Sequence, residues 1–175
     1  MPVPWSRRPV EPPDPSTLKP CRVLLASEGR KFSREAVAFA ADLARGSGTR
    51  VEVLSIARIW GTSLGMPAPG LLPTKKEWQD QRDLVADAVR ALKRRDVDAE
   101  GHVLGARNPA KYIVREAERF HVAAIVMGGD PPRHWLVGNL LWSQEPYRVR
   151  RRARLPVYIV MSRAAAPMTS PAKAR

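Results

Sequence analysis

The chain of 175 residues is poor in the side chains that build disulfides and metal sites. It has one cysteine, Cys21, and three histidines, His102, His121 and His134. A single cysteine cannot form a disulfide within the chain, and the histidines lack the spacing of metal ligands. We therefore expect no internal disulfide and no metal site. Cys21 comes just before a buried strand, so we interpret it as a packing residue.

Long apolar runs are also missing. No stretch approaches the roughly 20 apolar residues that a membrane-spanning helix needs. The first residues, Met-Pro-Val-Pro-Trp-Ser-Arg-Arg, do not contain the apolar core of a signal peptide. We therefore expect a cytoplasmic protein without a membrane span.

Acidic residues are scarce relative to basic ones. The chain has 17 Asp and Glu against 30 Lys and Arg, a formal net charge of +13. Such an excess favours acidic partners such as nucleic acid, ribosomes or anionic lipid. The alternative is a compositional habit of an arginine-rich proteome, and charge alone does not decide between them.

The densest run of charge is Arg148–Arg154, which contains five arginines. It is either a patch for nucleic acid or ribosomes, or the solvated face of a helix. Few aromatic residues interleave with these arginines, so the run does not predict a stacking platform for single strands.

Proline divides the chain. Six of the 17 prolines fall within residues 1–19, which have almost no periodic pattern. We expect residues 1–19 to be a disordered proline-rich arm, residues 20–162 to be one domain, and residues 163–175 to be a disordered tail.

Within the central region, short apolar runs alternate with segments of helical periodicity. Ser33, the pair Thr74 and Glu77, and Asn108 before a proline are start signals for three helices, and Gly46 is placed to stop the first. The expected strands are 22–27, 51–57, 97–103, a run into glycine within 121–130, and 156–161. Five strands with helices between them and no hairpin signal predict an α/β fold with a doubly wound parallel sheet. Such a sheet binds ligands where its strand order reverses.

The strand that runs into Gly128 and Gly129 is the most informative of these elements. A strand that ends in glycine lets a backbone close on a phosphate. The loop continues Pro131-Pro132-Arg133-His134-Trp135, however, and proline has no N–H to donate. The pair of glycines is either part of a ligand loop or a flexible exit from a buried strand.

Four segments in this order resemble the universal stress protein family. Residues 23–37 resemble its first strand, turn and first helix, 103–114 the entry to its third helix, 124–128 its fourth strand, and 156–160 its last. The resemblance covers roughly residues 20–162. It implies an adenine-nucleotide alpha-hydrolase-like fold with a five-stranded parallel sheet of order 3-2-1-4-5, and a homodimer joined through the last strand.

The resemblance also locates a nucleotide site. The ATP-binding branch of that family carries Gly-x2-Gly-x9-Gly-(Ser/Thr) from the end of the fourth strand, and Gly128 takes the first position. Counting forward puts Pro131, Leu141 and Trp142 at the others, whereas counting back from Pro156 puts the last pair at Ser143-Gln144. Neither register restores the second and third glycines. Each lost charge-assisted hydrogen bond to phosphate is worth about 1.5–3 kcal/mol.

The other half of the site is better preserved. Glu28 corresponds to the family's aspartate at the end of the first strand, and Ala26 keeps the small side chain that close approach needs. The candidate cofactor-binding residues, by this resemblance, are Ala26, Glu28, Met127, Gly128, Gly129 and Ser143. Glu28 is either a pocket acid or a solvated turn residue.

Two further sets of residues are candidates for function. Trp60, Trp135 and Trp142 could stack a base, plug a vacant pocket or form a contact surface, with plain packing as the alternative. Asp130, His134 and Ser143 are the residue types of a catalytic triad, but the chain has no Gly-x-Ser-x-Gly elbow, so we expect no catalysis.

The sequence therefore favours a non-catalytic stress-response protein of this type, with a degenerate nucleotide site, acting through an unknown protein partner. One alternative is an adenine-nucleotide sensor in which Glu28, Met127, Gly128 and Ser143 hold ATP or a related nucleotide. A second is a basic adaptor on RNA or ribosomes that uses Arg148–Arg154 and both tails.

Overall fold

The computed structural model describes residues 22–59, 72–129 and 145–161, which form a five-stranded parallel sheet. The strand order is β3-β2-β1-β4-β5, which confirms the expected topology. The strands are β1 (Arg22–Ser27), β2 (Val51–Arg58), β3 (Ala99–Ala106), β4 (Val122–Gly129) and β5 (Val157–Met161). The helices are α1 (Arg34–Gly46), α2 (Lys75–Lys93), α3 (Pro109–Arg119) and α4 (Glu145–Arg152).

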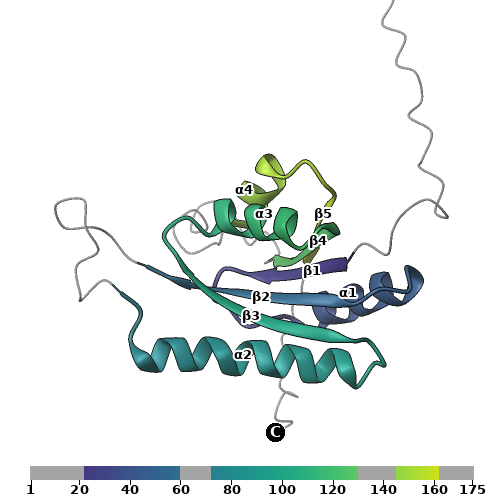
Figure 1. Cartoon of the computed structure of the whole chain (residues 1–175), viewed down its shortest axis with the longest axis horizontal. Coiled ribbons are helices and arrows are strands. Elements are labelled where there is room, and N and C mark those ends of the chain that lie inside the picture. The colour runs from purple at the N-terminus through teal and green to yellow at the C-terminus, as the bar shows by residue number, and fades with distance from the viewer. Residues whose placement is uncertain (1–21, 60–71, 130–144, 162–175) are drawn as a thin grey trace, which may run out of the picture.

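Helices cover both faces of the sheet, so the fold has three layers (Figure 1). Because successive side chains of a strand point to opposite faces, the same strands supply two separate cores. Val23 and Leu25 of β1 pack with α1 and α2, whereas Leu24 and Ala26 pack with α3 and α4. The central strands are therefore mainly apolar, as expected for strands covered on both sides, although β2 also buries Glu52 and Ser55.

The helices begin where the sequence predicts. The Ser33 side chain accepts a hydrogen bond from the N–H of Ala36, Thr74 and Glu77 form a complete capping box, and Asn108 accepts from the N–H of Lys111. The first helix also ends at the predicted glycine. Gly46 is its last helical residue, Ser47 is the cap, and the chain turns through a positive φ of 59° at Gly48.

The two edge strands differ in what they expose. Helix α2 packs on β3, whereas β5 leaves Tyr158 and Met161 each 40% exposed. Among the described residues, no helix is long and apolar enough to cross a bilayer. The two tails, Trp60, and the segment 130–144 lie outside the described residues.

Candidate functional site

The strand order reverses between β1 and β4, at the middle of the sheet. β1 pairs with β2 on one side and with β4 on the other, and Ala26 lies opposite Met127 in the β1–β4 ladder. From β1 the chain enters α1 on one face, whereas β4 precedes α4 on the other face. A crevice forms outside the carboxyl ends of strands at such a reversal, and this is where α/β sheets bind ligands.

A cavity of about 240 Å³ lies at this point. Its lining comes from the end of β1, the β1–α1 loop and the end of β4, and it includes Ala26, Glu28, Gly128 and Gly129. The structure thus brings together four of the six residues predicted from the sequence. Arg30 and Lys31 also line it, so the loop adds two cations that the sequence reasoning did not single out.

The β1–α1 loop has a tight turn that only glycine can complete. Gly29 has φ of 101°, and a Cβ there would lie 2.8 Å from the carbonyl oxygen of Ile56. The Gly29 carbonyl accepts a hydrogen bond of 3.1 Å from Gln81 of α2, and the Gln81 amide oxygen accepts one of 2.6 Å from Ser55 of β2. The loop beside the pocket is therefore held to α2 and β2 by Gln81 and Ser55, neither of which the sequence pattern indicated.

Glu28 is a buried acid with a partner in its own loop. Its side chain is 5% exposed, and Oε1 accepts a hydrogen bond of 2.8 Å from Nε of Arg30. The turn is locked by Ser27, whose Oγ accepts from the N–H of Arg30 at 3.0 Å and donates to its carbonyl at 2.6 Å. The interpretation of Glu28 as a solvated turn residue is therefore wrong, because the carboxylate is buried and paired beside the pocket.

The two glycines of β4 have different surroundings. A Cβ on Gly129 would lie 2.6 Å from Cγ2 of Ile159, so the close packing of β5 requires glycine there. A Cβ on Gly128 would meet Oγ of Ser33 at 3.5 Å, which is ordinary van der Waals contact. Gly129 therefore has a packing reason, whereas packing does not require glycine at position 128, beside the start of α1.

The other two predicted residues are Met127 and Ser143. The side chain of Met127 is fully buried in the core beneath α3 and α4, so only its backbone lies near the strand end. Ser143 lies outside the described residues, as do Pro131, Leu141 and Trp142 of the degenerate motif, Trp135, and the triad-type residues Asp130 and His134.

A larger groove of about 570 Å³ lies between α1 and α2. Lys31 and Phe32 line both the groove and the strand-end pocket. The groove lies on a helical face rather than at the carboxyl ends of the strands, so the topology favours the smaller pocket as the ligand site.

Glu145, at the start of α4, is a second buried acid that the sequence reasoning missed. It is 5% exposed, and its Oε2 accepts a hydrogen bond of 3.2 Å from the N–H of Ala110 in the first turn of α3. Arg148 binds Oε1 at 3.0 Å and Arg58 lies 3.7 Å from it. A helix N-terminus attracts anions. Glu145 therefore supplies, from within the chain, the negative charge that the start of α3 favours.

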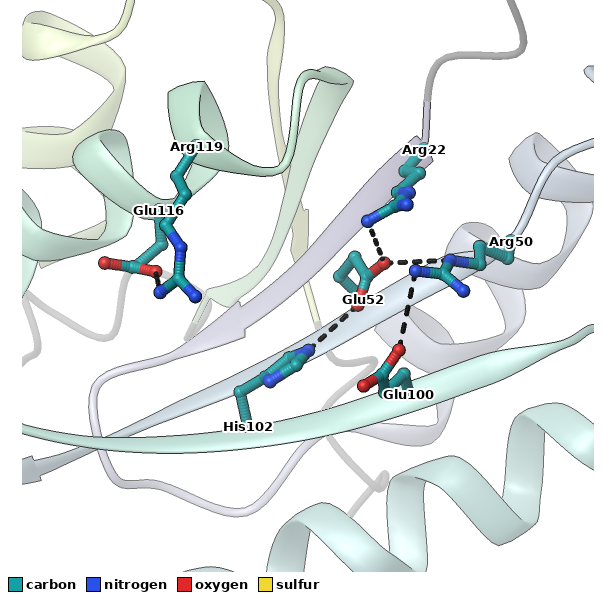
Figure 2. A network of polar contacts seen from close by, with 7 residues as sticks. All are labelled: Arg22, Arg50, Glu52, Glu100, His102, Glu116 and Arg119. Atoms are coloured by element: carbon teal, nitrogen blue, oxygen red, sulfur yellow. Dashed lines mark hydrogen bonds and ion pairs between the residues drawn. The ribbon is translucent and has the colours of Figure 1, made fainter.

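A third buried acid lies at the opposite, amino-terminal end of the strands (Figure 2). Glu52 of β2 is fully buried, and its carboxylate contacts Arg22 at 2.9 Å, Arg50 at 3.0 Å and Nε2 of His102 at 2.9 Å. Arg50 also reaches the exposed Glu100 at 3.4 Å. The cluster joins β1, β2 and β3 at one end of the sheet.

The oxygen and nitrogen atoms of Glu52, Glu100 and His102 come within 4.8 Å of one another, which is close enough to surround a cation. Two guanidinium groups already bind Glu52, however, and they would repel a metal ion placed beside it. We interpret the cluster as an ion-pair network that joins three strands. Sequence patterns do not indicate this network, because Glu52 and His102 lie 50 positions apart.

Comparison with known proteins agrees with this geometry. The model of the universal stress protein family matches residues 21–161. No curated protein sequence matches the chain. A universal stress protein from Archaeoglobus fulgidus is similar in structure, with a TM-score of 0.63 and 22% identity over 80% of this chain and 98% of that one.

Two other similar structures contain nucleotides. The A. fulgidus protein in complex with dAMP has a TM-score of 0.60 and 21% identity, covering 80% of this chain and 97% of that one. A universal stress protein in complex with cAMP has a TM-score of 0.58 and 19% identity, covering 82% and 98%. At this level of identity, the likeness establishes the fold alone.

A doubly wound parallel sheet with a pocket at its point of reversal defines the general class of α/β proteins that bind ligands at strand ends. Within that class, the chain belongs to the universal stress protein family, whose model matches most of its length.

Proposed function

We propose that the chain is a non-catalytic stress-response protein whose strand-end pocket does not hold a nucleoside triphosphate and which acts through contacts with other proteins. The pair formed by Glu28 and Arg30 carries this proposal. The carboxylate that would face a ribose or an adenine is already bound at 2.8 Å by the guanidinium of its own loop. A ligand must displace that guanidinium before it can use this oxygen, and charged hydrogen bonds are worth about 1.5–3 kcal/mol each.

The size of the pocket supports the same conclusion. Its volume of about 240 Å³ is below the roughly 300–1,000 Å³ that is usual for small-molecule sites. The motif positions that would cradle phosphate are Pro131 and Leu141, which lack glycine's freedom to approach a ligand closely. A triphosphate therefore loses both space and hydrogen-bond donors.

A second candidate function is an adenine-nucleotide sensor. It is favoured by the solved relatives in complex with dAMP and cAMP, both of which are monophosphates. Arg30 and Lys31 line the pocket and could hold one phosphate with side chains in place of backbone N–H groups. In this candidate, Ala26, Glu28 and Gly128 contact the nucleoside.

Thermal unfolding of the full chain with AMP, cAMP or Mg-ATP at 1 mM separates the two. A ligand present at 100 times its Kd stabilises a protein by about 2.7 kcal/mol, which raises Tm by several degrees. We expect no nucleotide to raise Tm by more than about 1 °C. A rise of several degrees with AMP or cAMP alone establishes the sensor, and a rise with Mg-ATP overturns the loss of triphosphate binding.

We also propose that the protein forms a homodimer through β5. Tyr158 on this edge strand packs against Phe39 of α1 with tilted rings, whose centroids are 5.2 Å apart, and the two side chains are 40% and 37% exposed. Exposed apolar side chains on an unpaired edge favour association. We expect Tyr158→Glu to halve the mass measured by light scattering, and Tyr147→Glu on α4 to leave it unchanged. A wild-type monomer would refute the dimer.

A further inference from the structure

The two helical faces of the sheet carry the same number of exposed cations but very different numbers of exposed acids. On one face, α1 and α2 expose seven cations: Arg34, Arg45, Lys75, Lys76, Arg82, Arg90 and Lys93. On the other, α3 and α4 also expose seven: Lys111, Arg115, Arg119, Arg148, Arg150, Arg151 and Arg152. Figure 1 shows α3 and α4 beside each other on that second face.

The acids distinguish the faces. Six exposed acids accompany the cations of α1 and α2: Glu35, Asp42, Glu77, Asp80, Asp83 and Asp87. On α3 and α4 the only exposed acid is Glu118, because Glu116 and Glu145 are 2% and 5% exposed. A mere compositional excess of arginine would affect both faces alike. The positive charge is instead concentrated on the face formed by α3 and α4, which we call the α3–α4 face.

Many cations of the α3–α4 face have no acid to neutralise them. Glu116 binds Arg115 and Arg119, at 3.2 and 2.9 Å; the latter pair is drawn in Figure 2. Within the described part of the chain, Lys111 and the arginines at 150, 151 and 152 make no ion pair, and neither do the flanking Arg107 and Arg154. On the opposite face, Arg45 pairs with Asp42 and Arg90 with Asp87, and among the described residues the other five exposed cations of α1 and α2 make no ion pair either. The two faces therefore differ in their exposed acids and not in the share of paired cations.

Helix electrostatics explain only part of this pattern. Cations in the last turn of α4 interact favourably with the helix dipole, so Arg150, Arg151 and Arg152 stabilise their own helix. The dipole gives no reason for the scarcity of exposed acids along α3, or for cations at its first turn, where Lys111 lies. A surface that keeps its acids buried and its cations exposed is suited to a polyanion.

We propose that the α3–α4 face binds the phosphodiester backbone of a nucleic-acid duplex. All four cations of α4 are arginine, whose planar guanidinium binds phosphate through two hydrogen bonds. Packed helices lie about 8–10 Å apart, so α3 and α4 present two rows of charge that can follow two lines of phosphates.

The aromatic residues favour a duplex over single strands or a membrane. Tyr147 is the one large apolar side chain that is exposed on this face among the described residues, at 45%. The ring of Tyr112 is covered by the guanidinium of Arg115, 4.3 Å from its centroid. One free aromatic provides neither a stacking platform for bases nor the apolar surface that inserts into a bilayer.

The test uses the full chain and a fluorescent duplex of 20 base pairs, as RNA and as DNA. The first variant replaces Arg150, Arg151 and Arg152 with Gln. The control replaces Lys75, Lys76 and Lys93 of α2 with Gln, which removes the same charge from the opposite face. A third variant, Arg107→Gln with Lys111→Gln, changes the same surface without touching the end of α4. Thermal unfolding verifies that each variant is folded.

We expect the first variant to weaken duplex binding at least tenfold at 0.1 M salt and to lower the slope of log K against log[salt] by about 2 to 3, since each phosphate contact contributes about 0.9 for B-DNA. The third variant should weaken binding several-fold, and the control should change it less than twofold. Equal losses in the first variant and the control would overturn the proposal, as would tighter binding to phosphatidylserine vesicles than to either duplex. The RNA and DNA arms identify which duplex is preferred.

Discussion

Nε of Arg30 lies 2.8 Å from Oε1 of Glu28, across a turn that Gly29 completes with a positive φ. This contact places a guanidinium on Glu28, the one acid among the described residues that line the pocket. The family resemblance implies that the acid at the end of β1 contacts a ligand. In this structure, Glu28 is instead contacted by Arg30 of its own loop. The Glu28–Arg30 pair is therefore the main reason to expect that the pocket does not hold a nucleoside triphosphate.

Shortening the side chain of Glu28 should weaken its pairing with Arg30 and improve nucleotide binding. Glu28→Asp withdraws the carboxylate by one methylene and weakens its contact with Arg30, so the oxygen becomes available to a ribose hydroxyl. We expect AMP to bind roughly tenfold more tightly, because one charged hydrogen bond is worth about 1.5 kcal/mol or more. Isothermal titration calorimetry measures the change, with Glu28→Gln as the control that lacks charge. Equal affinities in both variants would contradict the role given to this carboxylate.

Alanine at the two glycines of β4 should affect stability differently. Gly129→Ala places a Cβ 2.6 Å from Ile159, so we expect a loss of about 1–3 kcal/mol in unfolding free energy from overpacking. Gly128→Ala makes only an ordinary contact with Ser33 and should change stability by less than about 1 kcal/mol. Urea unfolding of both variants tests the pair. A larger loss for Gly128→Ala would show that the pocket side is the more tightly packed.

The cluster around Glu52 should stabilise the sheet. Glu52→Gln removes a fully buried carboxylate that holds Arg22, Arg50 and His102. We expect a loss of about 3 kcal/mol, at the low end for a broken buried pair, because both arginines are about one-third exposed and can reach water. The matched change Glu100→Gln, at a side chain 57% exposed, should cost less than about 0.5 kcal/mol. A stabilising response of the wild type to zinc, lost in His102→Gln, would instead establish a metal site.

The capping box of α2 should make stability depend on pH. The pKa of Glu77 is lowered from its ordinary value of 4.5 mainly by the hydrogen bond from the backbone N–H of Thr74. The hydrogen bond from the Thr74 side chain lowers it further. A lowered pKa in the folded state means that the contribution of Glu77 is complete above pH 4.5 and is lost as pH falls through the lower value. Glu77→Gln should therefore be less stable than wild type at pH 7, and this difference in stability should shrink as the pH falls below 4.5. A difference that grows toward acid would contradict the assignment.

The fold was predictable because its signals are local. Apolar runs, the cap at Ser33, the capping box at Thr74 and the Asn108–Pro109 pair each depend on a few neighbouring residues, and each was found where expected. Gly46 ends α1 as predicted, although the positive φ falls two residues later, at Gly48.

The site was predictable only in outline. A strand-end acid and glycine indicate the pocket, and Ala26, Glu28, Gly128 and Gly129 do meet there. The partners of buried charges could not be predicted, because Glu145 meets Ala110 across 35 positions of sequence and Glu52 meets His102 across 50. Sequence spacing gives no measure of such contacts, whereas the pairing of strands and helices determines them.

The amount of adenine nucleotide that accompanies the purified full-length protein tests the central claim most directly. The protein is heat-denatured, and the supernatant is analysed by liquid chromatography against the molar amount of chain. Because Arg30 is paired with Glu28 and the phosphate-binding motif has lost its second and third glycines, we predict far less than one nucleotide per chain. One ATP per chain in that supernatant would contradict the account.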